Sequence, residues 1–230
     1  MEFVIEEKYY NLLALVEKEL ADDTGHTLDH IQRVWRLAMQ IVAEEKEVDM
    51  EVLKIAVLLH DIARIKEDTD NSGNIDHAVL GAEIAEEILK TMYYPEETIR
   101  EIKHCIQTHR YKSGREPMSN EAKILYDADK VDALGAIGIA RGYIIAGEYH
   151  EHLHSFVPVD QYIEDNLVGG ESGGRIKEIS KHAPNLEFET KMRYIPEKLH
   201  SAKAKEIAKE RVKYMEEFFN RIRSEIVGDC

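Results

Sequence analysis

Apolar side chains recur every three or four positions along most of this chain, which is the period of an α-helix with one buried face. The chain has only 5 prolines, and long stretches lack the alternation that is typical of β-strands. We therefore predict an all-α fold. Helices are expected at residues 4–20, 27–45, 50–61, 76–89, 95–109, 119–132 and 202–226, with polar loops at 66–74 and 110–117 and weaker patterning at 146–190.

The most apolar of these helices contains V-L-K-I-A-V-L-L-H-D-I-A-R at residues 52–64, where His60 and Asp61 follow an apolar run. Such a helix is expected in the core, with Asp49 as its N-cap, and a core helix holds metal ligands still. Asp61 would lie at the negative end of the helix dipole, which favours a nearby cation. The alternative is structural, with His60 as a hydrogen-bonded core residue and Asp61 as a polar helix end.

Two further residues extend the pair to a set of two histidines and two aspartates. His30 lies in H-T-L-D-H-I-Q-R-V, and Asp129 lies in Y-D-A-D-K-V-D-A-L-G. Imidazole and carboxylate together bind divalent transition ions or magnesium. A bound ion lowers the pKa of water, so that a metal-bound water can attack a phosphate ester near neutral pH. The candidate metal ligands are therefore His30, His60, Asp61 and Asp129, for manganese, iron, nickel, magnesium or zinc.

The pattern H…HD…D resembles the HD-domain superfamily of metal-dependent phosphohydrolases. The similarity includes G-H-T-L-D-H-I-Q-R-V, L-L-H-D-I-A and E-A-K-I-L-Y-D-A-D-K-V-D-A-L-G, and it covers most of the chain, as in one subgroup of small, stand-alone HD hydrolases. It implies an HD-domain helical bundle, a metal ion held by the four residues above, and hydrolysis of a phosphorylated substrate. We expect one domain over 1–230, with a core at about 24–145, a lid or insertion at 146–190, and C-terminal helices at 191–226 that pack on the core.

Other side chains near these motifs offer proton transfer and phosphate binding. Several alternatives stay open: His26 could be a fifth ligand, a proton shuttle or a helix-start residue, and Arg33 could instead form an exposed ion pair with Asp29. The candidate catalytic residues are Asp61, His26 and His109, and the candidate substrate-binding residues are Arg33, Arg64, His77, Lys130 and Arg110.

Two groups of histidines raise separate hypotheses. His77 and His109 are each expected at a helix end, where they could bind a second metal ion or hydrogen-bond to the substrate and to water. His150, His152 and His154 alternate within the weakly patterned segment, and we expect them at the mouth of the lid.

The formal net charge of −15 disfavours a general nucleic-acid binder and an anionic membrane surface as partners. It also means that a phosphate site needs local positive charge, which the loop with Arg110, Lys112 and Arg115 could supply. The N-terminus lacks the pattern of a signal peptide, and the two cysteines lack a CxxC spacing, so we expect a cytoplasmic protein.

The function expected from these features is hydrolysis of nucleotides or related small phosphate esters, in a protein that could form a homodimer. Alarmone hydrolases of the superfamily carry an acidic pair just after the His-Asp pair, whereas this chain has Ile62-Ala63-Arg64-Ile65 there. That departure keeps a second function open: a metal-binding sensor or regulatory module without turnover.

Overall fold

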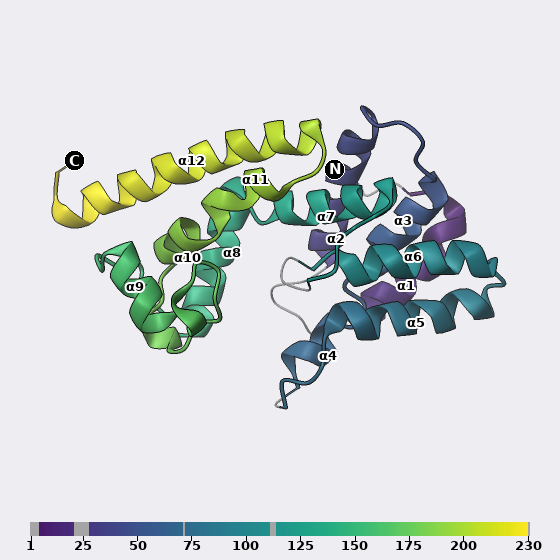
Figure 1. Ribbon diagram of the computed structural model, residues 1–230, viewed down its shortest axis with the longest axis horizontal. Helices are drawn as coiled ribbons and strands as arrows, with labels where there is room; N and C mark the ends of the chain where they lie inside the picture. Colours follow the sequence, from purple (N-terminus) through teal and green to yellow (C-terminus); the bar gives the residue numbers. More distant parts are fainter. Residues whose placement is uncertain (1–4, 21–27, 71, 111–113, 230) are drawn as a thin grey trace. The chain divides into compact units, whose positions relative to one another are not determined.

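The computed structural model describes residues 5–20, 28–70, 72–110 and 114–229, and over these ranges the all-α prediction is confirmed (Figure 1). The described backbone consists of helices and connecting turns, with one isolated β-bridge between Leu167 and Ile176. The chain divides into two compact units, Met1–Lys130 and Val131–Cys230. Every described residue that the sequence nominates for the metal or substrate site belongs to the first unit.

The first unit is built around α3 (Met50–Leu59), which packs against α1, α2 and α6. A second close pair in this unit is α5 with α6, which lie side by side in Figure 1. The other elements of the unit are η1 (Glu7–Tyr9), α1 (Tyr10–Glu19), α2 (Leu28–Val42), α4 (Arg64–Asp68), α5 (His77–Thr91), α6 (Glu96–Thr108) and the start of α7 (Asn120–Asp132).

Helix α3 has apolar side chains all round, and nearly all of them are buried, as expected for a core helix. The prediction that Asp49 caps this helix is confirmed. Its carboxylate accepts hydrogen bonds from the backbone N–H groups of Glu51 (2.9 Å) and Val52 (3.1 Å). The backbone N–H of Asp49 donates to Glu121 of α7 (2.6 Å). These bonds fix the start of the helix that ends at His60.

One expected loop is partly helical. Residues 66–74 were predicted to be irregular, but Lys66, Glu67 and Asp68 belong to α4, so that part of the prediction was wrong. The side chain of Arg64 reaches Glu67 and Asp68 at the i+3 and i+4 positions, which supports one turn of helix. Residue 27, where the second helix was expected to begin, lies outside the described residues.

The second unit contains the long segment of weak patterning, which carries short helices of its own. Its elements are α8 (Gly135–Glu148), α9 (Val159–Asn166), η2 (Val168–Gly170), η3 (Ile179–Lys181), α10 (Pro184–Thr190), η4 (Met192–Tyr194), α11 (Ile195–Lys198) and α12 (Ala202–Val227). Helix α12 extends over the range predicted for the last helix. Of the large apolar side chains along this helix, Met215 and Phe219 are buried, whereas Ile207, Val212, Phe218 and Ile222 are half-buried.

The organisation as one domain, with residues 191–226 packed on the core, stays a prediction. None of the helices in the described ranges combines the length and the apolar composition needed to cross a bilayer.

Replacing Asp49 by alanine should lower the free energy of unfolding by about 1 kcal/mol, because two N–H groups at the start of α3 lose their acceptor. Urea unfolding followed by circular dichroism measures the change. Asp49→Asn keeps an acceptor oxygen and should lose much less. Equal losses for the two variants would contradict the cap assignment.

Two glycines of α8 should respond to alanine in opposite directions. A Cβ at Gly138 would lie 2.1 Å from the carbonyl oxygen of Ala133, whereas a Cβ at Gly147 meets nothing within 4 Å. We expect Gly138→Ala to destabilise the protein by about 1–3 kcal/mol through overpacking. Gly147→Ala should stabilise it by about 0.5–1 kcal/mol through helix propensity. Thermal unfolding of both variants tests the pair.

Candidate metal centre

Asp61 lies between two pairs of histidines. Its Oδ2 atom is 3.5 Å from Nε2 of His30 and 3.7 Å from Nε2 of His60. Its Oδ1 atom is 3.5 Å from Nε2 of His77 and 3.5 Å from Nε2 of His109. All five side chains are buried. One carboxylate therefore connects a first donor group (His30, His60 and Asp61) with a second donor group (Asp61, His77 and His109), and within each group the ligand atoms lie within 4.8 Å of one another.

Asp129 joins the first donor group from α7. Its Oδ1 atom is 3.4 Å from Nε2 of His30, and its Oδ2 atom accepts from the ammonium group of Lys130 at 2.5 Å. Burial alone would raise the pKa of Asp129, but Lys130 and a hydrogen bond from His30 hold that pKa well below its usual value. Asp129 is therefore ionised at neutral pH, as a metal ligand must be.

His60 and His109 are oriented by the same kind of hydrogen bond, from Nδ1 to a backbone carbonyl in the last turn of the helix. Each is the C-cap residue of its helix, α3 for His60 and α6 for His109. Nδ1 of His60 lies 2.8 Å from the carbonyl oxygen of Val57, and Nδ1 of His109 lies 2.6 Å from that of Ile106. A carbonyl oxygen only accepts, so the proton is assigned to Nδ1 in both rings. In the neutral ring, Nε2 then carries a lone pair that points into the donor groups.

His77 is also protonated at Nδ1, but its hydrogen-bond partner is a carboxylate. It is the first residue of α5, and its Nδ1 atom lies 2.6 Å from Oε2 of Glu67 on α4. A carboxylate is an acceptor, so Nδ1 of His77 donates and Nε2 carries the lone pair.

The lone pairs of His77 and His109 face each other, because their Nε2 atoms are 3.2 Å apart. Nε2 of His60 and Nε2 of His30 are also close, at 3.3 Å. The facing lone pairs of His77 and His109 repel each other unless a cation lies between them. Neighbouring ligands about 2.1 Å from an ion in an octahedral site are about 3.0 Å apart, so the donor set fits a divalent metal ion.

The acid–base state of the imidazoles agrees with this arrangement. Burial lowers the pKa of His60 to about 4. Burial also lowers the pKa of His77, although the charge of Asp61 opposes the shift. Both rings are therefore neutral near pH 7, which is the protonation state that binds metals.

Two of the predicted substrate-binding arginines lie beside the second donor group. The guanidinium group of Arg64 contacts Oε2 of Glu67 and Oδ2 of Asp68, both at 3.1 Å. Nη1 of Arg110 contacts Oε1 of Glu67 at 2.8 Å and Oδ1 of Asp76 at 3.2 Å. Glu67 thus connects both arginines to His77. The assignment of these arginines to substrate binding stays a prediction.

The remaining nominated residues are less closely defined. Arg33 lies on α2, three residues after His30, and is half-buried. His26 and Lys112 lie outside the described residues. Glu67 was not nominated from the sequence, because residues 66–74 were expected to be a loop. The helical spacing of Glu67 from Arg64, directly after the His-Asp pair, is the signal that could have pointed to it.

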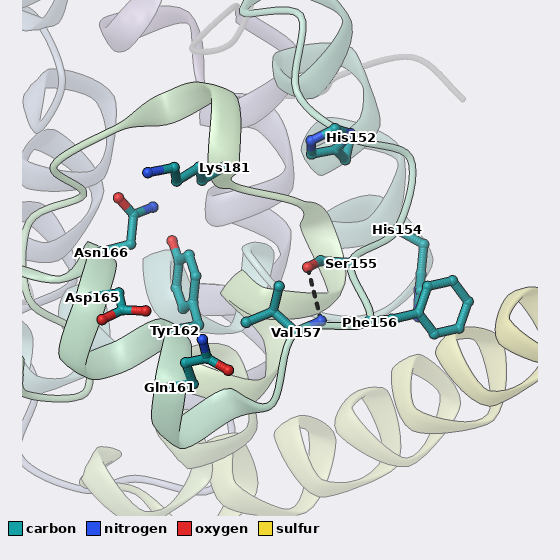
Figure 2. A pocket seen from close by; sticks show the side chains of 10 residues that line it. All are labelled: His152, His154, Ser155, Phe156, Val157, Gln161, Tyr162, Asp165, Asn166 and Lys181. Atoms are coloured by element: carbon teal, nitrogen blue, oxygen red, sulfur yellow. Dashed lines mark hydrogen bonds between the residues drawn. The ribbon is translucent and has the colours of Figure 1, made fainter.

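The second unit contains a separate pocket of about 690 Å³ (Figure 2). His152 and His154 line it, together with Phe156 and Tyr162. Burial raises the pKa of Tyr162 to about 12, so its hydroxyl stays protonated, and its oxygen lies 2.6 Å from Nδ1 of His182. The segment with His150, His152 and His154 is irregular here, and its role as a lid stays a prediction.

The chain is similar to known proteins over the range that contains both donor groups. The HD domain model matches residues 27–134, a range that contains every residue of both donor groups. The chain is 27% identical to protein YpgQ of Bacillus subtilis (strain 168) over 93% of this chain and 91% of YpgQ. A crystal structure of YpgQ in complex with ADP aligns with a TM-score of 0.67 and 24% identity, over 94% of this chain and 93% of that chain.

Two further solved structures are similar along almost the whole chain. One is a predicted HD superfamily hydrolase from an uncultured Thermotogales bacterium, with 28% identity, a TM-score of 0.61, and coverage of 94% of this chain and 91% of that chain. The other is an HD-superfamily hydrolase from Bacillus thuringiensis, with 25% identity, a TM-score of 0.69, and coverage of 95% of this chain and 96% of that chain.

Proposed function

This chain is an HD-domain protein, and on that basis we propose that it is a metal-dependent phosphohydrolase of nucleotides or related small phosphate esters. The observation that carries the proposal is the shared carboxylate of Asp61, with histidine Nε2 atoms facing each of its two oxygens. Two metal ions that share a carboxylate are a recurrent arrangement for displacement at phosphorus.

The two donor groups divide the ligands between two ions. His30, His60 and Asp129 would hold the first ion, His77 and His109 would hold the second, and Asp61 would bind both. Bound divalent ions supply activation of water for attack on phosphorus and neutralisation of charge on the phosphate. The imidazoles favour a transition ion over magnesium, so manganese, iron, nickel or zinc suits the second group better.

The side chains around the donors have distinct tasks in this proposal. Both nitrogens of His109 are engaged, Nδ1 by the carbonyl of Ile106 and Nε2 by the donor group, so His109 acts as a ligand and not as a proton shuttle. Lys130 keeps Asp129 charged. Arg64 and Arg110 present guanidinium groups that orient a phosphate. His26 remains our candidate for proton transfer.

The similarity to YpgQ supports a nucleotide as the substrate. That relative has been crystallised with ADP, and it is 27% identical to this chain over 93% of this chain and 91% of YpgQ. A nucleotide offers the small, anionic phosphate group that the proposed ions and arginines would bind. The alternative function, a sensor that binds metal and nucleotide without turnover, predicts the same ligands but no product.

The first test combines metal content with turnover. The protein loaded with manganese should hold two ions per chain by mass spectrometry and should hydrolyse members of a nucleotide panel. Asp61→Asn should reduce kcat/KM by more than about 100-fold, a larger loss than changes outside the ligand shell produce. Asp29→Asn, an exposed carboxylate beside His30, is the matched control and should behave like the wild type.

Two outcomes would contradict this proposal. Unchanged metal content in Asp61→Asn would mean that Asp61 is not a shared ligand. Absence of turnover with manganese, iron, nickel, magnesium and zinc, together with a nucleotide-induced rise in Tm, would establish the sensor instead.

Arg33 permits a second test, because its two interpretations predict different measurements. If Arg33 binds a phosphate oxygen, Arg33→Met should raise KM by about 10- to 100-fold, the cost of a charge-assisted hydrogen bond, with kcat little changed. The control Arg36→Met, about one helical turn further along α2 from His30, should leave both constants unchanged. An unchanged KM in Arg33→Met, with a loss of stability of a few tenths of a kcal/mol, would favour the ion pair with Asp29.

A further inference from the structure

The rings of His60, His77 and His109 are not all oriented by the same kind of hydrogen bond. His60 and His109 end their helices, and each bonds the carbonyl of the residue three positions earlier. His77 begins its helix, so the residue three positions before it is in a loop and offers no helical carbonyl. Another acceptor must therefore hold Nδ1 of His77.

Glu67 supplies this acceptor. Its Oε2 atom is 2.6 Å from Nδ1 of His77, and its side chain is 17% exposed, so water screens the contact only partly. The residue belongs to α4, the short helix that follows the His-Asp pair. Its negative charge also lies near the N-terminal end of α5, where the helix dipole stabilises an anion.

A competing donor lies next to the same ring atom. Nη1 of Arg64 is 3.2 Å from Nδ1 of His77 and 3.1 Å from Oε2 of Glu67. A guanidinium group can only donate. If the carboxylate were absent, Arg64 would donate to Nδ1, and the ring proton would move to Nε2. The lone pair that faces Asp61 and His109 would then be lost.

We propose that Glu67 is a positioning residue that selects the Nδ1-protonated tautomer of His77 against the competing donor Arg64. It thereby keeps the Nε2 lone pair of His77 available to the second donor group. The inference deepens the proposed function, because it rests on that group holding the second ion. Carboxylates that orient a ligating histidine typically contribute 10- to 100-fold in metal affinity.

The tautomer is measured first, on metal-free protein, by long-range ¹H–¹⁵N correlation NMR of the histidine rings. We expect the Nδ1–H form of His77 in the wild type and the Nε2–H form in Glu67→Ala. Glu67→Gln retains an acceptor oxygen and should keep the wild-type tautomer. In the double variant with Glu67→Ala and Arg64→Met the competing donor is also absent, so the Nδ1–H form should be partly restored.

Metal affinity is measured next, by titration of manganese against a chelating dye. In Glu67→Ala the second equivalent should bind about 10- to 100-fold more weakly, whereas the first equivalent should be unchanged. The matched control is Asp68→Asn, which removes the neighbouring carboxylate that contacts Arg64 but not His77. It should change neither affinity by more than about threefold.

These measurements separate the inference from the proposed function. If Glu67→Ala keeps the Nδ1–H tautomer and binds the second equivalent as tightly as the wild type, the role of Glu67 is refuted, even if the enzyme is active. If the wild type binds only one equivalent, the two-ion centre is refuted, and the tautomer spectra still decide the role of Glu67. Glu67→Leu, which fills the same space without an acceptor, replaces the alanine variant if that variant does not fold.

Discussion

The centre depends on acceptor atoms that are buried face to face. Nε2 of His77 and Nε2 of His109 are 3.2 Å apart, and Nδ1 of each ring already donates to another group. No proton is left to lie between them. Buried polar atoms without a partner cost free energy, and two facing lone pairs add repulsion. The surrounding helices must hold this arrangement against that cost, which is the expected behaviour of a site built for a cation.

The ends of three helices hold the histidines in this arrangement. An apolar core packs α3 against α1, α2 and α6, and the packing brings the C-terminal ends of α3 and α6 together with the N-terminal end of α5. The last carbonyls of a helix lack intrahelical partners, so a histidine at that end can bond one of them and turn its other nitrogen outward. The same unsatisfied groups that usually need a cap therefore orient two of the ligands.

The sequence predicted the helices better than it predicted which of their side chains come together at the metal centre. The buried helix that ends in His60 and Asp61 follows from apolar periodicity and from the cap at Asp49. His30 and Asp129 were joined to that pair by resemblance, since no local pattern indicates which distant helices converge. The sequence raised His77 and His109 as a possible second group, but only three dimensions show that both rings face the other oxygen of Asp61. Glu67 was missed because a five-residue helix in a polar segment has too little periodicity to be distinguished from a loop.

Charge shows which groups can attract an anionic substrate to a chain of net charge −15. The guanidinium groups of Arg64, Arg110 and Arg115 contact Glu67, Asp68 and Asp76, so this network is balanced and adds no net positive field. Lys130 and Asp129 likewise offset each other. Two divalent ions would exceed the charge of Asp61 and Asp129, and at physiological salt their field reaches about 8 Å. The ions would therefore attract the phosphate, and the arginines would act only at contact distance, once an incoming oxygen competes with Glu67 and Asp76 for their N–H groups.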